Sequence, residues 1–360
     1  MVKIAVYTIA LNEEKFLLRW YNSAKDADLL LIADTGSTDR TVEKAQKLGI
    51  HVEQISVVPW RFDVARNLNL DMIPEDFDIC IQLDMDEILP EGWREIVEAA
   101  YHEGNVWPEY KHTLVGDGWE LPQTYFKIHP RHGLRWKFPI HEMLVAEPGY
   151  EFTRKRIDLE VKHIQDLEKS RSSYLELIEL GVEEDPTDWR MLQYLQWDYF
   201  LRKRWNDVLK VGSRVLVQLE PLNLSVEKAA TCMWSAEAAF ELGYHDWAIE
   251  WADRAIWYAP LFFEAKGVRA LLAYRMQDWN NCYKYAIQIS THSRQEHHLA
   301  RASYWDWFMY DLIALSAHHL GKQSEAINFG ELAIQGNPNE PRLKDNMKYY
   351  TRGTFSPLDK

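Results

Sequence analysis

The chain has 360 residues, of which 47% are apolar and 27% charged, the composition of an ordinary soluble globular protein. At this length two domains are expected. The net charge is -14, and acidic residues outnumber basic ones in both halves of the chain. Neither half offers the positive field that gathers phosphate backbones, so nucleic acid is not expected as a partner.

The cysteines and the apolar runs bear on the compartment. Cys80, Cys232 and Cys282 are far apart and odd in number, which is neither a disulfide framework nor a zinc spacing and favours a reducing compartment. No apolar run approaches the ~20 residues of a membrane helix. The N-terminus runs straight into a strand pattern without the apolar core of a signal peptide. We therefore expect a cytoplasmic protein with no membrane span.

The first half of the chain alternates short apolar runs with amphipathic stretches, the pattern of βαβ units and a mostly parallel sheet. Gly49 stands where a left-handed C-cap would end the second helix. The expected strands are Lys3–Ala10, Leu29–Asp34, Val52–Ile55 and Ile79–Asp84, and the expected helices are Glu13–Ala24, Asp39–Leu48, Val64–Asp71 and Trp93–His102.

Between Tyr110 and His163 the pattern changes to short, turn-broken pieces of strand rich in Gly and Pro. The segment Lys127–Lys137 is the one locally basic stretch. It could hold phosphate or an anionic acceptor. A hairpin with a solvated face is the plainer interpretation, and we favour it.

From about Ser170 to Tyr350 helical periodicity takes over and the sequence repeats. Gly243, Ala248, Ala255 and Pro260 recur at the same spacing as Gly321, Ala326, Ala333 and Pro338, with weaker copies around Trp205 and Trp279. Small residues at such spacings let paired helices approach closely. We expect tetratricopeptide-like repeats, with a plain α-bundle as the alternative. Trp247 and Trp251, four residues apart, are expected to pack between repeats.

These patterns predict a fold of two domains and a tail. An α/β domain with a Rossmann-like, mostly parallel sheet would cover residues 1–168. An all-α repeat domain would follow over residues 169–350, and residues 351–360 would form the tail.

Two polar patches follow the first two strands, at the edge where open parallel sheets bind ligands. The first is Asn12-Glu13-Glu14, and the second runs from Asp34 to Asp39. Gly36 would permit a tight turn there, and a strand-end Asp can bind a ribose hydroxyl or a base. Taken singly, Asn12, Thr38 and Asp39 are better explained as helix caps.

The third patch is Asp84-Met85-Asp86-Glu87, where the fourth strand ends. Carboxylates two residues apart can turn toward one hard cation and leave its other positions for phosphates and water. An acidic loop that only caps the helix at Trp93 is an equal alternative on spacing alone.

Together the three patches resemble the family-two glycosyltransferases of GT-A fold. The likeness extends to the lipopolysaccharide-core type and related sugar transferases that often carry tetratricopeptide repeats. It covers about residues 1–165 well and the repeats more loosely. The matching residues are Asn12-Glu13-Glu14, Asp34-Thr35-Gly36-Ser37-Thr38-Asp39-Arg40-Thr41, Ala65-Arg66-Asn67, Leu83-Asp84-Met85-Asp86-Glu87, Ile140-His141-Glu142 and His163.

The resemblance implies a nucleotide-sugar donor, most often a UDP-sugar, and a Mn²⁺ or Mg²⁺ ion. Asp34 would contact the nucleoside, and Arg66 would lie near the nucleotide. Asp86, with Asp84 helping, would hold the cation against the diphosphate, where it stabilises the charge on the leaving group. The residues expected at the donor are Asn12, Glu13, Asp34, Ser37, Arg66 and Asp84.

An inverting transferase also needs a base for the acceptor's proton. Glu142 is the candidate, and a surface glutamate is its plain alternative. His163, or else His141, could complete the metal shell or touch the diphosphate, since imidazole also binds Mn²⁺. A structural histidine is an equal alternative for each.

The function expected is metal-dependent, inverting transfer of a sugar to a glycan or lipopolysaccharide-type acceptor. The alternatives are a protein acceptor gripped by the repeats, a DNA acceptor, and an inactive nucleotide-binding scaffold. A homodimer or a protein partner would bind through the repeats. A sugar nucleotidyltransferase is disfavoured, because Asn12-Glu13-Glu14 is not the Gly-rich, basic loop that a triphosphate needs.

Overall fold

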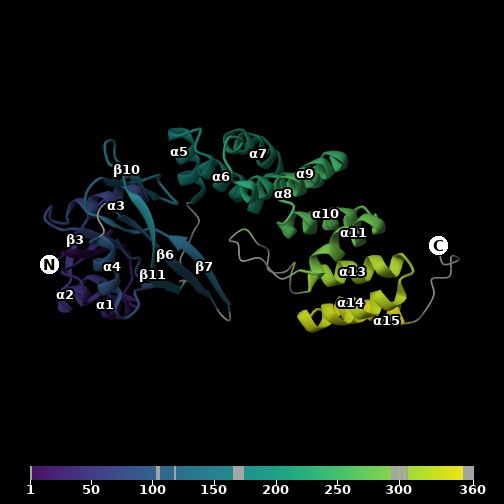
Figure 1. The fold of residues 1–360 in the computed structure, drawn as a ribbon, viewed down its shortest axis with the longest axis horizontal. Helices are drawn as coiled ribbons and strands as arrows, with labels where there is room; N and C mark the ends of the chain where they lie inside the picture. The colour runs from purple at the N-terminus through teal and green to yellow at the C-terminus, as the bar shows by residue number, and fades with distance from the viewer. Residues whose placement is uncertain are drawn as a thin grey trace. The chain divides into compact units, whose positions relative to one another are not determined.

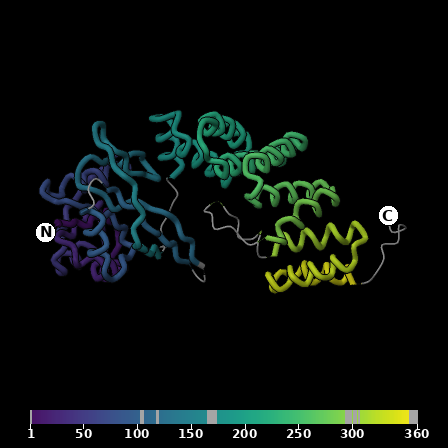
Figure 2. The backbone as a smooth tube through the Cα atoms, in the orientation of Figure 1, coloured from purple at the N-terminus to yellow at the C-terminus, as the bar shows by residue number. Residues whose placement is uncertain are grey.

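The computed structural model describes residues 2–102, 106–116, 119–164, 174–292, 299, 304 and 307–351. The chain divides into two compact units, Met1–Gly181 and Val182–Lys360. It passes from one to the other within helix α5, Tyr174–Glu184 (Figures 1 and 2). The domain boundary predicted at residue 168 and residues 352–360 of the predicted tail lie outside the described residues. No helix in the described part of the chain is long and apolar enough to cross a membrane.

The first unit is built on a five-stranded sheet, and it confirms the predicted α/β class. The strand order is β3-β2-β1-β4-β8; the first four strands are parallel, and β8 runs antiparallel to β4. The strands are β1 Ile4–Ala10, β2 Leu29–Asp34, β3 His51–Gln54, β4 Ile79–Gln82 and β8 Ile128–Pro130.

Both faces of this sheet are covered. Ile4 and Val6 of β1 belong to a core shared with α1, α2 and α4, whereas Ala5 and Tyr7 face a second core with α3 and the hairpin β9-β10. A strand buried on both faces reads as a continuous apolar run, which explains the sequence of β1. The covering elements are α1 Leu17–Ala24, α2 Thr41–Lys47, α3 Phe62–Asp71, α4 Trp93–Tyr101, β9 Leu134–Lys137 and β10 Met143–Ala146.

A second sheet, in the order β5-β11-β6-β7, lies beside the acidic patch. Its strands are β5 Glu87–Ile88, β6 Val106–Gly116, β7 Trp119–Tyr125 and β11 Thr153–Ile164. The prediction of only short pieces between Tyr110 and His163 was therefore wrong for β6 and β11. β6 contains Pro108, and its register with β11 shifts between Arg156 and Glu160, so neither strand shows an unbroken alternation of apolar and polar residues.

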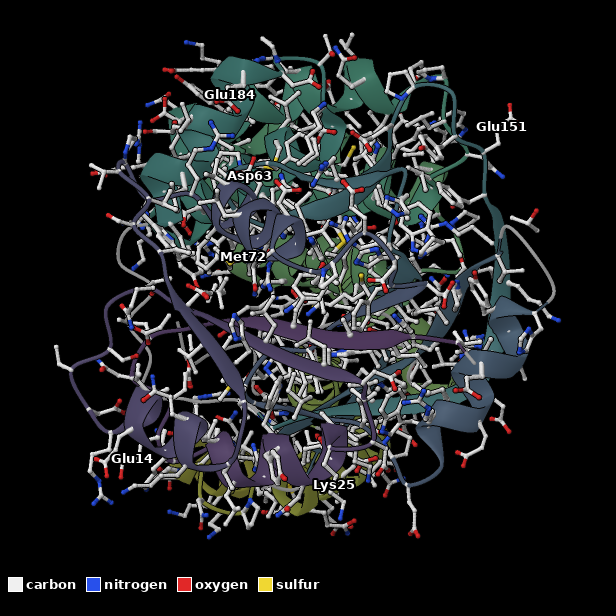
Figure 3. The ribbon with its side chains drawn as sticks, turned by 90° about the vertical axis from the view of Figure 1, so that its left-hand side faces the viewer. Glu14, Lys25, Asp63, Met72, Glu151 and Glu184 are labelled. Atoms are coloured by element: carbon white, nitrogen blue, oxygen red, sulfur yellow. The ribbon has the colours of Figure 1, made fainter. Side chains whose placement is uncertain are left out.

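Two helix starts were predicted too early. Helix α1 begins at Leu17, because a turn from Glu13 to Phe16 comes first, with the Phe16 amide donating to the Glu13 carbonyl at 3.0 Å. Figure 3 shows α1 running between the labelled Glu14 and Lys25. Helix α2 begins at Thr41 instead of Asp39. Gly49 does adopt the predicted left-handed conformation, at φ +77°.

The second unit is all-helical and consists of tetratricopeptide-like antiparallel helix pairs. Helices α6 and α7, α8 and α9, α10 and α11, and α13 and α14 pack as pairs, and α15 packs on α14. Their bounds are α6 Trp189–Leu201, α7 Trp205–Leu219, α8 Ser225–Glu241, α9 His245–Tyr258, α10 Phe263–Arg275, α11 Trp279–Ser290, α13 Phe308–His319, α14 Gln323–Gly336 and α15 Pro341–Thr351.

The repeated small residues fall where the repeat prediction requires them. All four repeated alanines of α9 and α14 are buried, and Gly243 and Gly321 adopt positive φ before these helices. The prediction for the two tryptophans is right for Trp251, which is 8% exposed, and wrong for Trp247, which is 49% exposed. The ring of Trp247 lies edge-on to Tyr244, 6.1 Å away between centroids, at the start of α9.

Candidate active site

The first two polar patches form one loop cluster beyond β1 and β2. Asn12 has φ +58°, and its Oδ1 accepts hydrogen bonds from the amides of Thr38 (2.7 Å) and Asp39 (3.2 Å). Its own amide donates to Ser37 Oγ at 2.8 Å. The interpretation of Asn12 as the cap of α1 is therefore wrong, because its side chain joins the β1 and β2 loops instead.

Two neighbours of Asn12 have mainly structural contacts. The amide of Glu13 donates to Thr41 Oγ1 at 2.8 Å, and the residue is 5% exposed. Asp39 Oδ1 accepts from the Thr41 amide at 2.9 Å, but the N-cap residue of α2 is Arg40, so the interpretation of Asp39 as the cap is off by one residue. A role of Glu13 at the donor stays a prediction.

Asp34 ends β2 and is fully buried. Its Oδ2 accepts from the amides of Gly36 and Ser37, both at 3.0 Å, and Gly36 makes this turn with φ +109°. Its Oδ1 is buried without a hydrogen-bond partner among the described residues. An unpaired buried acceptor costs about 1–3 kcal/mol, so this oxygen is where a donor group of a ligand would be favoured.

Arg66, on α3, joins two of the predicted site residues. Its Nε donates to Glu142 Oε1 at 2.5 Å and its Nη2 to Asp84 Oδ1 at 3.0 Å, while the guanidinium lies 5.2 Å from the ring centre of Trp136. Burial lowers the pKa of Arg66, but the charges of Asp84 and Glu142 outweigh it and raise the pKa above its usual value. Nη1 is a buried donor without a partner among the described residues.

Asp84 is held by three donors. Oδ1 accepts from Arg66 and from Gln82 Nε2 (2.8 Å), and Oδ2 accepts from Lys127 Nζ (2.8 Å). Burial raises the pKa of Asp84, but Arg66 and Lys127 outweigh it and hold the pKa well below its usual range. The carboxylate is fixed and charged, with both oxygens engaged.

Lys127 and His112 were missed by the sequence reasoning. Lys127 Nζ also donates to Glu87 Oε1 at 3.0 Å, and His112 Nε2 donates to the same oxygen at 2.8 Å. Burial raises the pKa of Glu87, but Lys127 outweighs it, and His112 helps to lower the pKa to about 2. Glu87 Oε2 accepts from the Asp84 amide at 2.8 Å.

The basic stretch 127–137 is thus not the solvated hairpin that we favoured. The side chain of Lys127 is 15% exposed, His129 is 0% exposed and Arg131 is 7% exposed. Arg131 donates to the Ile73 carbonyl, and His129 Nε2 lies 3.0 Å from the Tyr7 hydroxyl. The only sequence signal for Lys127 was its place at the start of the basic stretch, which does not reveal that a buried acid pair lies opposite.

Asp86 and His163 form the neighbouring pair. Asp86 is 8% exposed, and His163 Nε2, on β11, lies 3.3 Å from Asp86 Oδ2. Burial lowers the pKa of His163, but Asp86 outweighs it and raises the pKa. The structure thus brings together a carboxylate and an imidazole that are far apart in the sequence, as the metal prediction requires.

A different trio, Glu87, His112 and His163, also presents ligand atoms within 4.8 Å of one another. Glu87 already uses both oxygens, with Lys127 and His112 on one and the Asp84 amide on the other. An ammonium 3.0 Å from Oε1 would repel a cation bound to that oxygen. Asp86 with His163 is therefore the better-suited pair.

Glu142 and His141 lie in the segment 138–142 that joins β9 to β10, where Phe138 and His141 both have positive φ. The side chain of Glu142 is 12% exposed and shares Arg66 with Asp84, so it lies at the same site as the acids. The ring of His141 lies edge-on to Tyr174, with centroids 6.4 Å apart. Roles of His141 and Glu142 in chemistry stay predictions.

Acids and basic groups thus converge beyond the carboxyl ends of β1, β2 and β4, where α/β enzymes bind their ligands. Residues 5–161 match the family model described as glycosyl transferase family 2. The first unit is a domain of that family, and the chain is a glycosyltransferase. Among curated proteins, none matches the chain.

Solved structures similar to the chain include MamA, at 15% identity over 48% of this chain and 91% of that one, with a TM-score of 0.37. A thermophilic TPR protein of Thermus thermophilus has 15% identity over 50% of this chain and 89% of that one, with a TM-score of 0.36. PilF of Pseudomonas aeruginosa has 12% identity over 47% of this chain and 70% of that one, with a TM-score of 0.39. The repeat architecture rests on the helix pairs described above.

Proposed function

We propose that the protein transfers a sugar, with inversion and with the help of a divalent cation, from a nucleoside diphosphate to a glycan or lipopolysaccharide-type acceptor. The observation that carries this proposal is the pair Asp86 and His163, 3.3 Å apart, beside an Asp84 already held by Arg66 and Lys127. A UDP-sugar is the first donor to consider.

The donor's nucleoside would lie at the β1 and β2 loops. Asp34 Oδ1, a buried acceptor without a partner among the described residues, would take a hydrogen bond from a ribose hydroxyl or a base N–H. Asn12 and Ser37 hold the loop around it. Arg66 Nη1, a buried donor with no described partner, would point an N–H at a phosphate oxygen.

Asp86 and His163 fit Mn²⁺ or Mg²⁺, with the imidazole favouring Mn²⁺. When bound, the cation would stabilise the negative charge that develops on the diphosphate leaving group. Asp84 has a supporting role in this scheme, because its oxygens accept from Arg66, Gln82 and Lys127. It would fix the loop from which Asp86 projects.

Glu142 would accept the proton of the acceptor hydroxyl. Among the described residues its Oε1 has a partner in Arg66, which orients the carboxylate and leaves Oε2 for the acceptor. Arg66 thereby links the base Glu142 to Asp84, and would hold the base in a fixed position relative to the donor site.

A protein side chain as acceptor is the second candidate, favoured by exposed aromatic side chains at and after the start of α9. Tyr244, Trp247 and Trp257 are 52%, 49% and 75% exposed. Such rings are common anchors for polypeptide partners.

The test is a thermal-shift screen of UDP-, GDP-, CMP- and dTDP-sugars with and without Mn²⁺. A ligand that binds only the native state stabilises it by about 2.7 kcal/mol at a hundredfold excess over Kd. We expect a Mn²⁺-dependent shift with one sugar nucleotide that Asp86→Asn removes and that Asp71→Asn, at an exposed ion pair with Arg135, retains. No shift with any donor would refute the proposal and favour an inactive scaffold.

A further inference from the structure

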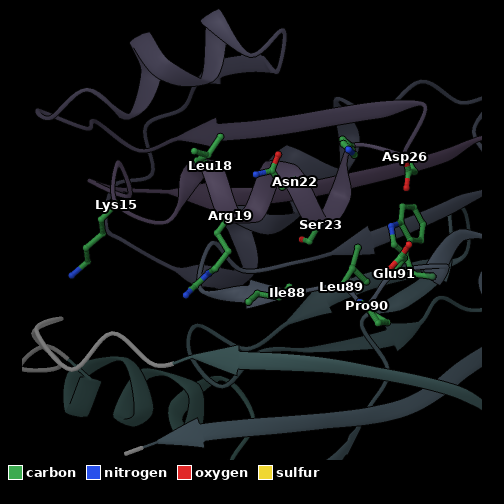
Figure 4. Close-up of a pocket in the computed structure, with 12 residues that line it drawn as sticks. Lys15, Leu18, Arg19, Asn22, Ser23, Asp26, Ile88, Leu89, Pro90 and Glu91 are labelled. Carbon is green, nitrogen blue, oxygen red and sulfur yellow. The ribbon is translucent and has the colours of Figure 1, made fainter.

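A cleft lies on the other side of β5 from Glu87. It has a volume of about 940 Å³ and is formed by α1, the turn after it, and the segment from Ile88 to the start of α4 (Figure 4). Glu87 is 1% exposed and faces His112, whereas its strand neighbour Ile88 lines the cleft. Because successive side chains of a strand point to opposite faces, the cleft is separate from the acid site.

The wall of this cleft contains hydrogen-bond donors without acceptors among the described residues. Nε and Nη2 of Arg19 are buried and have no such partner there, and its guanidinium instead lies 5.3 Å from the ring centre of Phe16. Nε1 of Trp93, a residue 1% exposed, also has no partner in the described structure. Each such buried donor costs about 1–3 kcal/mol, so the cleft favours a ligand rich in acceptor oxygens.

The charges along the cleft differ from one end to the other. Figure 4 shows Lys15 and Arg19 at one end and Asp26 and Glu91 at the opposite end. Lys25, which caps α1 next to Asp26, brings the lining to three cations and two acids in a chain whose net charge is -14. The cationic end suits a phosphate or carboxylate, and the acidic end suits hydroxyl groups, which donate to carboxylates.

A ligand that fits both ends has an anionic group at one end and hydroxyl groups at the other. An acidic sugar has this chemistry. We propose that the cleft binds a sugar bearing a phosphate or carboxylate group, with that group at Arg19 and Lys15. If the protein transfers sugars as proposed above, this cleft binds a part of an acidic glycan acceptor that lies away from the reacting hydroxyl. It begins at Ile88, two residues after Asp86 in the chain.

The experiment measures binding of four probes by ligand-observed NMR at constant ionic strength: glucose 6-phosphate, glucuronate, glucose and inorganic phosphate. We expect glucose 6-phosphate to bind at least tenfold more tightly than glucose or phosphate. Comparing glucuronate with glucose 6-phosphate shows whether the cleft prefers a carboxylate or a phosphate. Arg19→Leu should weaken glucose 6-phosphate binding at least tenfold, and Arg19→Lys should restore part of it. Arg156→Leu, at an exposed arginine of β11, is the matched control and should bind as wild type.

Folding is controlled by the thermal midpoint without ligand. Arg19→Leu removes donors that have no described partner and replaces the guanidinium beside Phe16 by an apolar side chain, so its thermal midpoint should stay close to that of wild type. Equal binding of glucose 6-phosphate and glucose, tighter binding of phosphate alone, or full binding by Arg19→Leu would each overturn the proposal.

The two proposals fail separately. Asp86→Asn should lose the donor shift and keep glucose 6-phosphate binding, and Arg19→Leu should do the reverse. Glucose 6-phosphate binding without any donor shift would support the acidic-sugar site and refute the donor site.

Discussion

The interiors of the two units differ in how they use charge. In the first unit Arg66, Asp84, Glu87 and Lys127 are mostly buried and exchange hydrogen bonds between α3, β5 and the segments that follow β4 and precede β8. In the second unit small apolar residues, such as the alanines of α8 and α9, make up much of the interior. Among the described residues, the second unit buries eight polar or charged side chains, against fourteen in the first. Close helix packing needs small side chains, whereas a site for a charged ligand needs fixed charges. The interior of the second unit is therefore suited to close packing, and that of the first unit to binding a charged ligand.

The sharpest test of the chemical interior is Glu142→Gln. Glutamine keeps an acceptor for Arg66 Nε but cannot take a proton from the acceptor hydroxyl. We expect kcat to fall about 10²- to 10⁴-fold with donor affinity unchanged, measured by steady-state turnover and by donor thermal shift. Glu147→Gln, at an exposed glutamate paired with Arg135, is the control. Full turnover in Glu142→Gln would remove Glu142 from the mechanism.

Lys127→Met tests whether the same charges also hold the fold. Removing the ammonium leaves Asp84 and Glu87 buried beside one another with less compensation. Breaking such a pair costs about 3–5 kcal/mol, which urea unfolding would measure. Lys47→Met, at an exposed i,i+4 pair, should cost less than about 0.5 kcal/mol. Equal stability of the two variants would mean that the buried network contributes nothing to the fold.

The pH dependence of stability should have opposite signs at two buried acids, Glu87 in the first unit and Asp311 in the second. Glu87 has its pKa lowered to about 2 in the folded chain, so its contribution is present above the unfolded pKa near 4.5 and is lost as the pH falls toward 2. The size of this loss is on the order of 3 kcal/mol. Burial, opposed by Arg342, raises the pKa of Asp311 in the second unit, so the contribution of Asp311 to stability grows as the pH falls through this raised pKa.

Hydrogen exchange resolved by unit, followed from pH 6 to pH 3, measures both slopes. Relative to wild type, Glu87→Gln should reduce the stability that the first unit loses on acidification, whereas Asp311→Asn should increase the loss in the second unit or reduce its gain. Changes of the same sign in the two variants would contradict the comparison.

Gly212→Ala tests the packing interior. Alanine is normally the better residue within a helix by about 1 kcal/mol, yet here the added Cβ would stand 2.6 Å from Ser235 Oγ and closer still to Gln196. Gln196 is fully buried and donates to the Thr231 carbonyl and Ser235, so it cannot easily move. We expect a loss of about 1–3 kcal/mol, measured by thermal unfolding.

The adjacent change Ser213→Ala, at an exposed position of the same helix, should instead be neutral or slightly stabilising. A stabilised Gly212→Ala variant would show that the close approach of α6, α7 and α8 is looser than the structure indicates.

The sequence alone determined the fold class, the repeats and the strand-end patches. Apolar runs buried on both faces, such as β1, and alanines at fixed spacing are local patterns. They can be recognised in the sequence without knowing which segments they pack against. Gly36 and Gly49 were predictable for the same reason, since a positive φ is a property of one residue.

Only the tertiary structure decided which charges face each other. Lys127 and His112 belong to no recognisable sequence motif. They are part of the site because Lys127, directly before β8, and His112, in β6, both lie within hydrogen-bond distance of Glu87. Asn12 was interpreted as a helix cap from the sequence. In the structure a turn precedes α1, and the Asn12 side chain accepts a hydrogen bond from the loop after β2. Which charged side chains pair depends on sheet register and loop geometry. These are set by many weak contacts together, so the pairs have no fixed spacing in the sequence.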